Sequence, residues 1–127
     1  MITTARFGTR DLARASGFWS VIAPMVGARL VYERDSLFAY RCDKGAMLLI
    51  GIPLEGEHDV GNGNMAAFTA DSRALVDAVH AMALELGGTC EGPPGIRGDD
   101  PDGFYGAYFR DLDGNKLTVF CFGPPDA

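Results

Sequence analysis

The sequence predicts an α+β domain made of two βαβββ modules, and three observations carry this prediction. A strand, a helix and further strands follow one another in the same order in both halves of the chain. Glycines end each of the two expected helices. The length of 127 residues suits one domain, and the strands of each half would expose one face unless the other half covered it. Residues 1–127 are therefore expected to form a single domain.

The first module is expected to occupy about residues 1–54. Residues 2–9 carry β-branched and aromatic side chains, which predicts a strand, and residues 11–26 change to the apolar spacing of a helix. Gly27 ends this helix in the manner of a left-handed C-cap glycine. Three strands are then predicted, at residues 29–33, 37–42 and 46–52.

The second module is expected at about residues 64–123, after a linker at residues 55–63 that contains three glycines. It begins with a predicted strand at 64–70 and a helix at 72–86, with Asp71 or Ser72 as the N-cap. A hairpin with strands 105–110 and 116–122 closes the module. Residues 92–103, rich in Pro, Gly and Asp, are expected to be a long loop.

Composition and charge exclude several classes of partner. Hydrophobic residues make up 47% of the chain and charged residues 22%, as in proteins that fold without a metal or disulfides. The net charge is −6 and the basic residues stand singly, which argues against a nucleic-acid partner. No apolar run approaches the roughly 20 residues that cross a bilayer, which argues against a membrane partner.

The cysteines and the N-terminus indicate a reducing compartment. Cys42, Cys90 and Cys121 are odd in number and lack CxxC pairing, so we expect reduced, partly buried thiols that form neither a disulfide framework nor a nucleophile. The N-terminal residues lack the basic, apolar and small-residue regions of a secretory signal. The expected location is cytoplasmic.

The segment YGAYFRDLDGNKL at residues 105–117 resembles the closing hairpin of the vicinal oxygen chelate superfamily, which includes glyoxalases, bleomycin resistance proteins and extradiol dioxygenases. Further matches are RDL at 10–12, FW at 18–19, GNG at 61–63, VH at 79–80 and GG at 87–88, so the resemblance covers nearly the whole chain. It implies that the two βαβββ modules curl into an incomplete barrel with a concave ligand cleft, usually within a homodimer.

The resemblance also implies where a metal would bind, since most enzymes of the family hold a divalent ion through His, Gln and Glu on the first and last strands of each module. The corresponding positions here are Thr4, Leu49, Met65 and Thr118. Such ions need imidazole or carboxylate ligands, which none of these residues supplies. A register error of one residue would add only Asn64 as a weak ligand. We therefore expect no metal and no cofactor.

Other candidate metal ligands have simpler interpretations. His58 lies within the glycine-bearing linker and is expected to be solvated. His80 lacks a second ligand one helical turn away, so a packed or capping histidine is expected. Asp99, Asp100 and Asp102 lack the late bidentate Glu of a calcium loop and are expected to form a solvated acidic loop.

Strand alternation places Arg6 on the same face as Thr4, the face that the family turns toward its ligand. Arg6 would either anchor an anionic ligand or make a structural pair with a carboxylate. The apolar side chains on this face would either line a pocket or fill the barrel as core. The candidate cleft residues are Thr4, Arg6, Leu49, Met65, Thr118 and Phe120.

These observations favour a metal-free protein that binds or sequesters a small organic molecule, as the bleomycin resistance proteins of the superfamily do, and that pairs as a homodimer. The alternative is a glyoxalase-like metal-dependent lyase or dioxygenase with displaced ligands. A third interpretation is an enzyme that uses a side chain such as Arg6 or Tyr105 without a metal. The sequence itself identifies no ligand.

Overall fold

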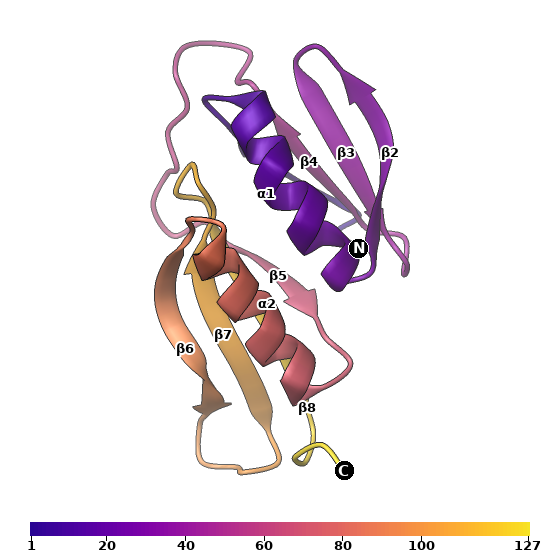
Figure 1. Cartoon of the computed structure of the whole chain (residues 1–127), viewed down its shortest axis with the longest axis vertical. Helices are drawn as coiled ribbons and strands as arrows, with labels where there is room; N and C mark the ends of the chain where they lie inside the picture. The colour runs from indigo at the N-terminus through magenta and orange to yellow at the C-terminus, as the bar shows by residue number, and fades with distance from the viewer.

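The computed structural model describes all 127 residues, Met1 to Ala127, and confirms the α+β class with two βαβββ modules. Each module contributes one four-stranded sheet and one helix, and the sheets do not close into a barrel (Figure 1). Neither helix is long and apolar enough to span a membrane. The elements are β1 (Thr4–Gly8), α1 (Leu12–Met25), β2 (Ala28–Arg34), β3 (Leu37–Cys42), β4 (Met47–Gly51), β5 (Ala66–Thr69), α2 (Arg73–Glu85), β6 (Thr89–Arg97), β7 (Phe104–Arg110) and β8 (Lys116–Phe122).

The two sheets share one topology, with strand orders β1-β4-β3-β2 and β5-β8-β7-β6. In each sheet the first strand of the module runs parallel to the last, and the remaining pairs are antiparallel. Thr4 is thereby paired with Met47 on β4, and Ala67 with Thr118 on β8. The pseudo-repeat expected from the sequence is therefore present in the hydrogen bonding as well as in the order of elements.

Both helices lie on the same side of the molecule, α1 over the first sheet and α2 over the second, and they contact each other (Figure 1). The Asp11 side chain accepts a hydrogen bond from the Arg14 N–H and caps α1. Ser72, rather than Asp71, caps α2 by accepting from the Leu75 N–H. Capping thus fixes both helix starts within a residue of the predicted positions.

One hydrophobic core runs across both modules, between the helices and the sheets. Trp19 of α1 packs against Phe68 of β5, with ring centroids 6.1 Å apart, and Phe18 lies 6.4 Å from Phe109 of β7. The helix of the first module therefore covers strands of the second. Strand alternation predicts that Leu48, Ile50, Phe68, Leu117, Val119 and Cys121 point away from the cleft, under the helices. The first five are buried, and Cys121 is partly buried against the core.

The prediction of a loop over residues 92–103 was wrong for its first half, because β6 extends to Arg97. This strand is the edge of its sheet and pairs only with β7. An edge strand needs hydrogen bonds on one side only, so it tolerates Pro93 and Pro94, which lack an N–H. Register shifts on either side of Gly92 absorb the irregular backbone.

A buried carboxylate joins the modules at the end of β1. Asp113, in the β7–β8 turn, is 3% exposed. It accepts hydrogen bonds from the Thr9 hydroxyl at 2.5 Å, the Arg10 N–H at 2.9 Å and the Arg14 guanidinium at 3.2 Å. Two turns that lie about a hundred residues apart in sequence are held together by this one side chain.

The expectation that His58 is solvated was also wrong, since the residue is 8% exposed. Its ring packs against Gly8, where the absence of a Cβ leaves room for the imidazole. Its Nε2 lies 3.3 Å from the Asp113 carbonyl oxygen, and its own carbonyl accepts from Arg10 at 3.3 Å. The linker is thus anchored at the same junction, a contact that local composition does not reveal.

We expect Asp113→Ala to lower the free energy of unfolding by about 3 kcal/mol, because it leaves several partly or fully buried donors without an acceptor. Urea denaturation measures this change. Asp99→Ala, an exposed site in the 98–103 loop, is the control and should change stability by less than about 0.5 kcal/mol. Equal stability of the two variants would show that the Asp113 contacts do not hold the modules together.

Candidate ligand-binding site

A cavity of about 350 Å³ lies at the junction of the modules, between β1 and β4 on one side and β5 on the other. Ten of its eleven lining residues are apolar, and Thr4 is the exception. Thr4 and Met65 are two of the four positions that the sequence resemblance implies for metal ligands. We name this space the junction cavity. Its lining is Ile2, Thr4, Ala5, Cys42, Ala46, Met47, Leu48, Met65, Ala66, Ala67 and Phe68.

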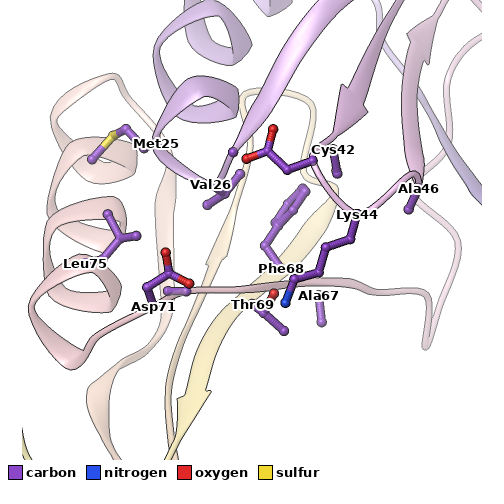
Figure 2. A pocket seen from close by; sticks show the side chains of 13 residues that line it. Met25, Val26, Cys42, Lys44, Ala46, Ala67, Phe68, Thr69, Asp71 and Leu75 are labelled. Atoms are coloured by element: carbon purple, nitrogen blue, oxygen red, sulfur yellow. The ribbon is translucent and has the colours of Figure 1, made fainter.

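A second cavity, of about 240 Å³, borders the junction cavity on the helix side and reaches the end of α1 and the start of α2. The two share Cys42, Ala46, Ala67 and Phe68 as a common wall. Figure 2 shows charged side chains around this second cavity, with Lys44 extending from the β3–β4 turn and Asp71 at the β5–α2 connection. The apolar wall between the modules is therefore accessible from two directions.

Met65 and Thr118 form a contact beside the junction cavity. The Thr118 hydroxyl donates a hydrogen bond to the Met65 sulfur at 2.9 Å. Thr118 is 2% exposed, whereas Met65 is 48% exposed and lines the cavity. Thr118 is accordingly covered, and it acts on the cavity by holding Met65.

Arg6 lies apart from the junction cavity. Its guanidinium donates to the Ile52 carbonyl at 3.1 Å and lies against Gly51. It lines an open polar depression of about 400 Å³, together with Gly8 of β1 and with Glu57 and His58 of the linker. None of the chain's three ion pairs includes Arg6, so the carboxylate pairing considered from the sequence does not form.

Leu49 and Phe120 occupy further positions on the strands of the cleft face. Leu49 is half-buried between Arg6 of β1 and Ala39 of β3, its partners in the sheet. Phe120 stacks on Phe104 at a centroid distance of 5.0 Å, beside Phe122. Neither residue lines the junction cavity. Of the six candidates, the structure brings together Thr4, Met65 and Thr118.

Cys42 and Ala46 are cavity residues that the sequence reasoning missed. Cys42 ends β3 and Ala46 precedes β4, and both border the two cavities. Burial raises the pKa of the Cys42 thiol, and the neighbouring Asp43 carboxylate adds to this effect, so the thiol stays protonated at neutral pH. The sequence predicts that both residues lie at the ends of strands. It does not show which strand ends meet at the junction of the modules.

The residues at the family's metal positions do not fit a divalent ion. Thr4 and Thr118 offer neutral hydroxyls, Met65 a thioether and Leu49 no donor, and the Thr118 hydroxyl is already bonded to the Met65 sulfur. No group of three or more His, Cys, Asp and Glu side chains comes together elsewhere in the chain. No chemical step through a metal follows from this donor set.

The remaining candidates from the sequence lie outside both cavities. His80 is 6% exposed and packed, as expected, with its Nε2 3.3 Å from the Cys90 sulfur. Asp99, Asp100 and Asp102 are exposed in the 98–103 loop. All three cysteines are free thiols.

Comparison with solved structures connects this arrangement to known proteins. The chain is similar to a glyoxalase/bleomycin resistance protein from Albidiferax ferrireducens, with a TM-score of 0.84 and 33% identity over 94% of this chain and 97% of that one. A lactoylglutathione lyase from Agrobacterium tumefaciens has a TM-score of 0.64 and 24% identity, covering 94% of this chain and 92% of the lyase. A glyoxalase/bleomycin resistance protein/dioxygenase family enzyme from Burkholderia phytofirmans has a TM-score of 0.71 and 15% identity, covering 93% and 95%. No family model and no curated protein matches the chain.

Two βαβββ modules with a shared core and a cavity at their junction define a glyoxalase-like fold. At 33% identity over nearly the full length of both chains, the Albidiferax similarity shows more than the fold. The protein belongs to the glyoxalase/bleomycin resistance protein family, and the predicted resemblance to the vicinal oxygen chelate superfamily is confirmed. The lyase and the dioxygenase family enzyme, at lower identity, support the fold alone.

We expect the untagged chain, purified without chelator, to retain no stoichiometric zinc, nickel or iron at the junction, because Thr4, Met65 and Thr118 cannot complete a coordination shell. Elemental analysis by mass spectrometry after dialysis measures the metal content. Metal that an imidazole holds elsewhere in the chain would be lost in His58→Gln or in His80→Gln. A stoichiometric metal that survives both changes and is lost in Thr118→Val would contradict this expectation.

Proposed function

We propose that the protein binds and sequesters a small, largely apolar organic molecule in the junction cavity. The observation that carries the proposal is the cavity itself, whose volume of about 350 Å³ and lining of ten apolar residues around Thr4 suit such a ligand. Pockets for organic ligands are mostly apolar, with a few polar groups that set orientation. The Thr4 hydroxyl is the polar side chain available for this role.

The two methionines of the site favour an aromatic or other apolar group. Met47 and Met65 both line the cavity, and unbranched thioether side chains adapt to irregular ligands and contact aromatic rings favourably. The hydrogen bond from Thr118 restrains the Met65 sulfur and leaves its terminal methyl group to adjust. The ligand would therefore bind a partly preorganised wall.

A longer ligand would leave the cavity along the concave face and meet the other candidate residues. On the first module it would pass Leu49 and reach Arg6, whose guanidinium bonds only a backbone carbonyl and stays free to pair with an anion. On the second module it would reach Phe120 and its aromatic neighbours. Arg6 would therefore make the protein bind ligands with a carboxylate or phosphate more tightly than neutral ligands.

The alternative, a metal-dependent lyase or dioxygenase with displaced ligands, needs a cluster of strong donors near the cavity. The only donors at the former metal positions are two hydroxyls and a thioether, and two of these are bonded to each other. A metal-free enzyme using Tyr105 has no better support, since that hydroxyl donates to Asp77 at 2.6 Å, away from the cavity. No observation favours either activity over binding.

We expect Met65→Trp to fill the junction cavity and abolish binding, while changing the free energy of unfolding by less than about 1 kcal/mol, because the side chain is half exposed. Thermal-shift screening with small aromatic compounds finds a probe ligand, and the same measurement on the variant tests the site. Leu84→Trp, on the exposed side of α2, is the matched control and should keep the shift.

A loss of about 1–3 kcal/mol in Met65→Trp would show instead that side chains already fill the space. An unchanged thermal shift in that variant would place the ligand elsewhere. For a probe that carries a carboxylate, Arg6→Ala should weaken binding about tenfold through the lost charge-assisted hydrogen bond, whereas a neutral analogue should be unaffected.

We also propose that two copies of the chain form a homodimer. The edge strand β2 exposes Leu30, Val31 and Tyr32, and exposed apolar side chains on an unpaired strand edge favour association. Light scattering at micromolar concentration should give twice the mass of the chain. Val31→Lys should shift it toward the monomer, while Leu84→Lys on α2 should not. A wild-type monomer would overturn the proposal.

A further inference from the structure

A thiol and an imidazole meet on the outer side of the second module. Cys90, near the start of β6, has its sulfur 3.3 Å from Nε2 of His80 on α2. The thiol is exposed, whereas His80 is 6% exposed and fixed in the helix–sheet interface. A nucleophile within hydrogen-bond distance of an immobilised base is the arrangement that activates thiols in proteins.

The Cys90–His80 pair is separate from the junction cavity. Cys90 stands opposite Phe109 on β7, and Phe109 is buried under the helices, so Cys90 lies on the helix-covered face of the sheet. Thr118 and Phe120 belong to the other face. The strand β6 lies at the edge of its sheet (Figure 1), with a register shift just after Cys90. Since Cys90 is exposed, a reagent can reach it from this edge.

The charges around His80 favour a neutral base that can take up a proton. Burial lowers the pKa of His80, so the ring is neutral at pH 7. In the tautomer that carries its proton on Nδ1, the Nε2 accepts the thiol proton. The Asp77 carboxylate, on the preceding turn, acts in the opposite sense and would stabilise the ring once protonated. Tyr105 donates to Asp77 at 2.6 Å, and this bond raises the pKa of Tyr105 to about 12, so the donor keeps its proton.

Charged side chains on the neighbouring strands β6 and β7 pair with each other. Glu91 follows Cys90 on β6 and forms an ion pair with Arg110 of β7. Arg110 follows Phe109, so strand alternation turns it to the opposite face. On the helix-covered side, Asp77 is therefore the carboxylate that affects the pKa of His80.

We propose that Cys90 and His80 form a nucleophilic pair that adds covalently to small α,β-unsaturated carbonyl compounds. The Cys90 sulfur forms a bond to the β-carbon of the electrophile while its proton passes to His80 Nε2. The carbon–carbon π bond opens to an enolate, which takes the proton back from the imidazolium at the α-carbon. The product is a thioether adduct, and the addition needs no oxidant, reductant or leaving group.

The other two thiols are poorer nucleophiles. Burial raises the pKa of Cys42 and of Cys121, and neither sulfur has an imidazole beside it. Both are less exposed than Cys90. Since thiol reactivity depends on proton removal and access, Cys90 should be the first of the three to react.

N-ethylmaleimide is a suitable probe, because it is an α,β-unsaturated dicarbonyl compound. The intact protein is treated with limiting reagent at pH 7, and peptide mass spectrometry locates the adduct. We expect Cys90 to react first and its rate constant to fall about tenfold or more in His80→Gln, which keeps a donor near Nε2 but cannot accept the proton. His58→Gln, at the other buried histidine, should leave the rate constant unchanged.

The pH profile separates catalysis by His80 from mere proximity. Between pH 7 and 8 the rate at Cys90 should stay nearly constant in the wild type, because His80 is already neutral. In His80→Gln it should rise steeply with pH, because the proton is then removed by hydroxide rather than by the imidazole. Asp77→Asn, at an exposed helix position, should lower the wild-type rate about twofold by removing a charge that stabilises the imidazolium.

First reaction at Cys42 or Cys121 would overturn the proposal. So would an unchanged ratio of the Cys90 and Cys42 rate constants in His80→Gln, and this ratio corrects for any general loosening of the fold. If His80→Gln does not fold, an unchanged rate in Asp77→Asn together with a steep rise with pH in the wild type is the contradicting result.

Discussion

The carboxylate of Asp113 is the constraint on which the arrangement of the two modules depends. It is almost fully buried and satisfied by the Thr9 hydroxyl, the Arg10 N–H and the Arg14 guanidinium. An unpaired charge at this depth would cost several kcal/mol, so the end of β1 and the β7–β8 turn are stable only together. This contact fixes the first module against the second. Together with the hydrophobic core that both modules share, it determines how β1 lies relative to β5, and the junction cavity lies between these two strands.

The character of that cavity fits the residues at the four positions that the family resemblance implies for metal ligands. A set of carboxylates and imidazoles without a metal would leave charges to be desolvated, whereas Thr4, Met65, Leu49 and Thr118 carry none. The one buried hydroxyl among them, Thr118, finds an acceptor in the Met65 sulfur. These uncharged positions are therefore satisfied without a metal, and the space that Thr4 and Met65 border suits an organic molecule better than an ion.

Periodicity and capping residues predicted the elements whose signals are local. Both helices begin within a residue of the predicted positions, and alternation correctly assigned Leu117 and Val119 to the core. The strand β6 was missed because prolines and glycines normally mark loops, and only its place at a sheet edge makes them acceptable. Alternation also placed Arg6 on the face of Thr4 but could not show that the two line different depressions. The burial of His58 depends on Gly8 and Asp113, residues distant in sequence, which no local pattern contains.

Strand alternation also explains how one sheet supports two unrelated sites. On β8, Thr118 faces the cleft while Leu117 and Val119, its neighbours, lie in the core with no exposed surface. The core positions hold the sheet to the helices whatever stands between them, so the cleft positions can change chemistry without loss of the fold. On the opposite face of the sheet, positions at the edge can also change without loss of the fold. There Cys90, which pairs with the buried Phe109, contacts His80, so the proposed reactive thiol shares no residue with the junction cavity.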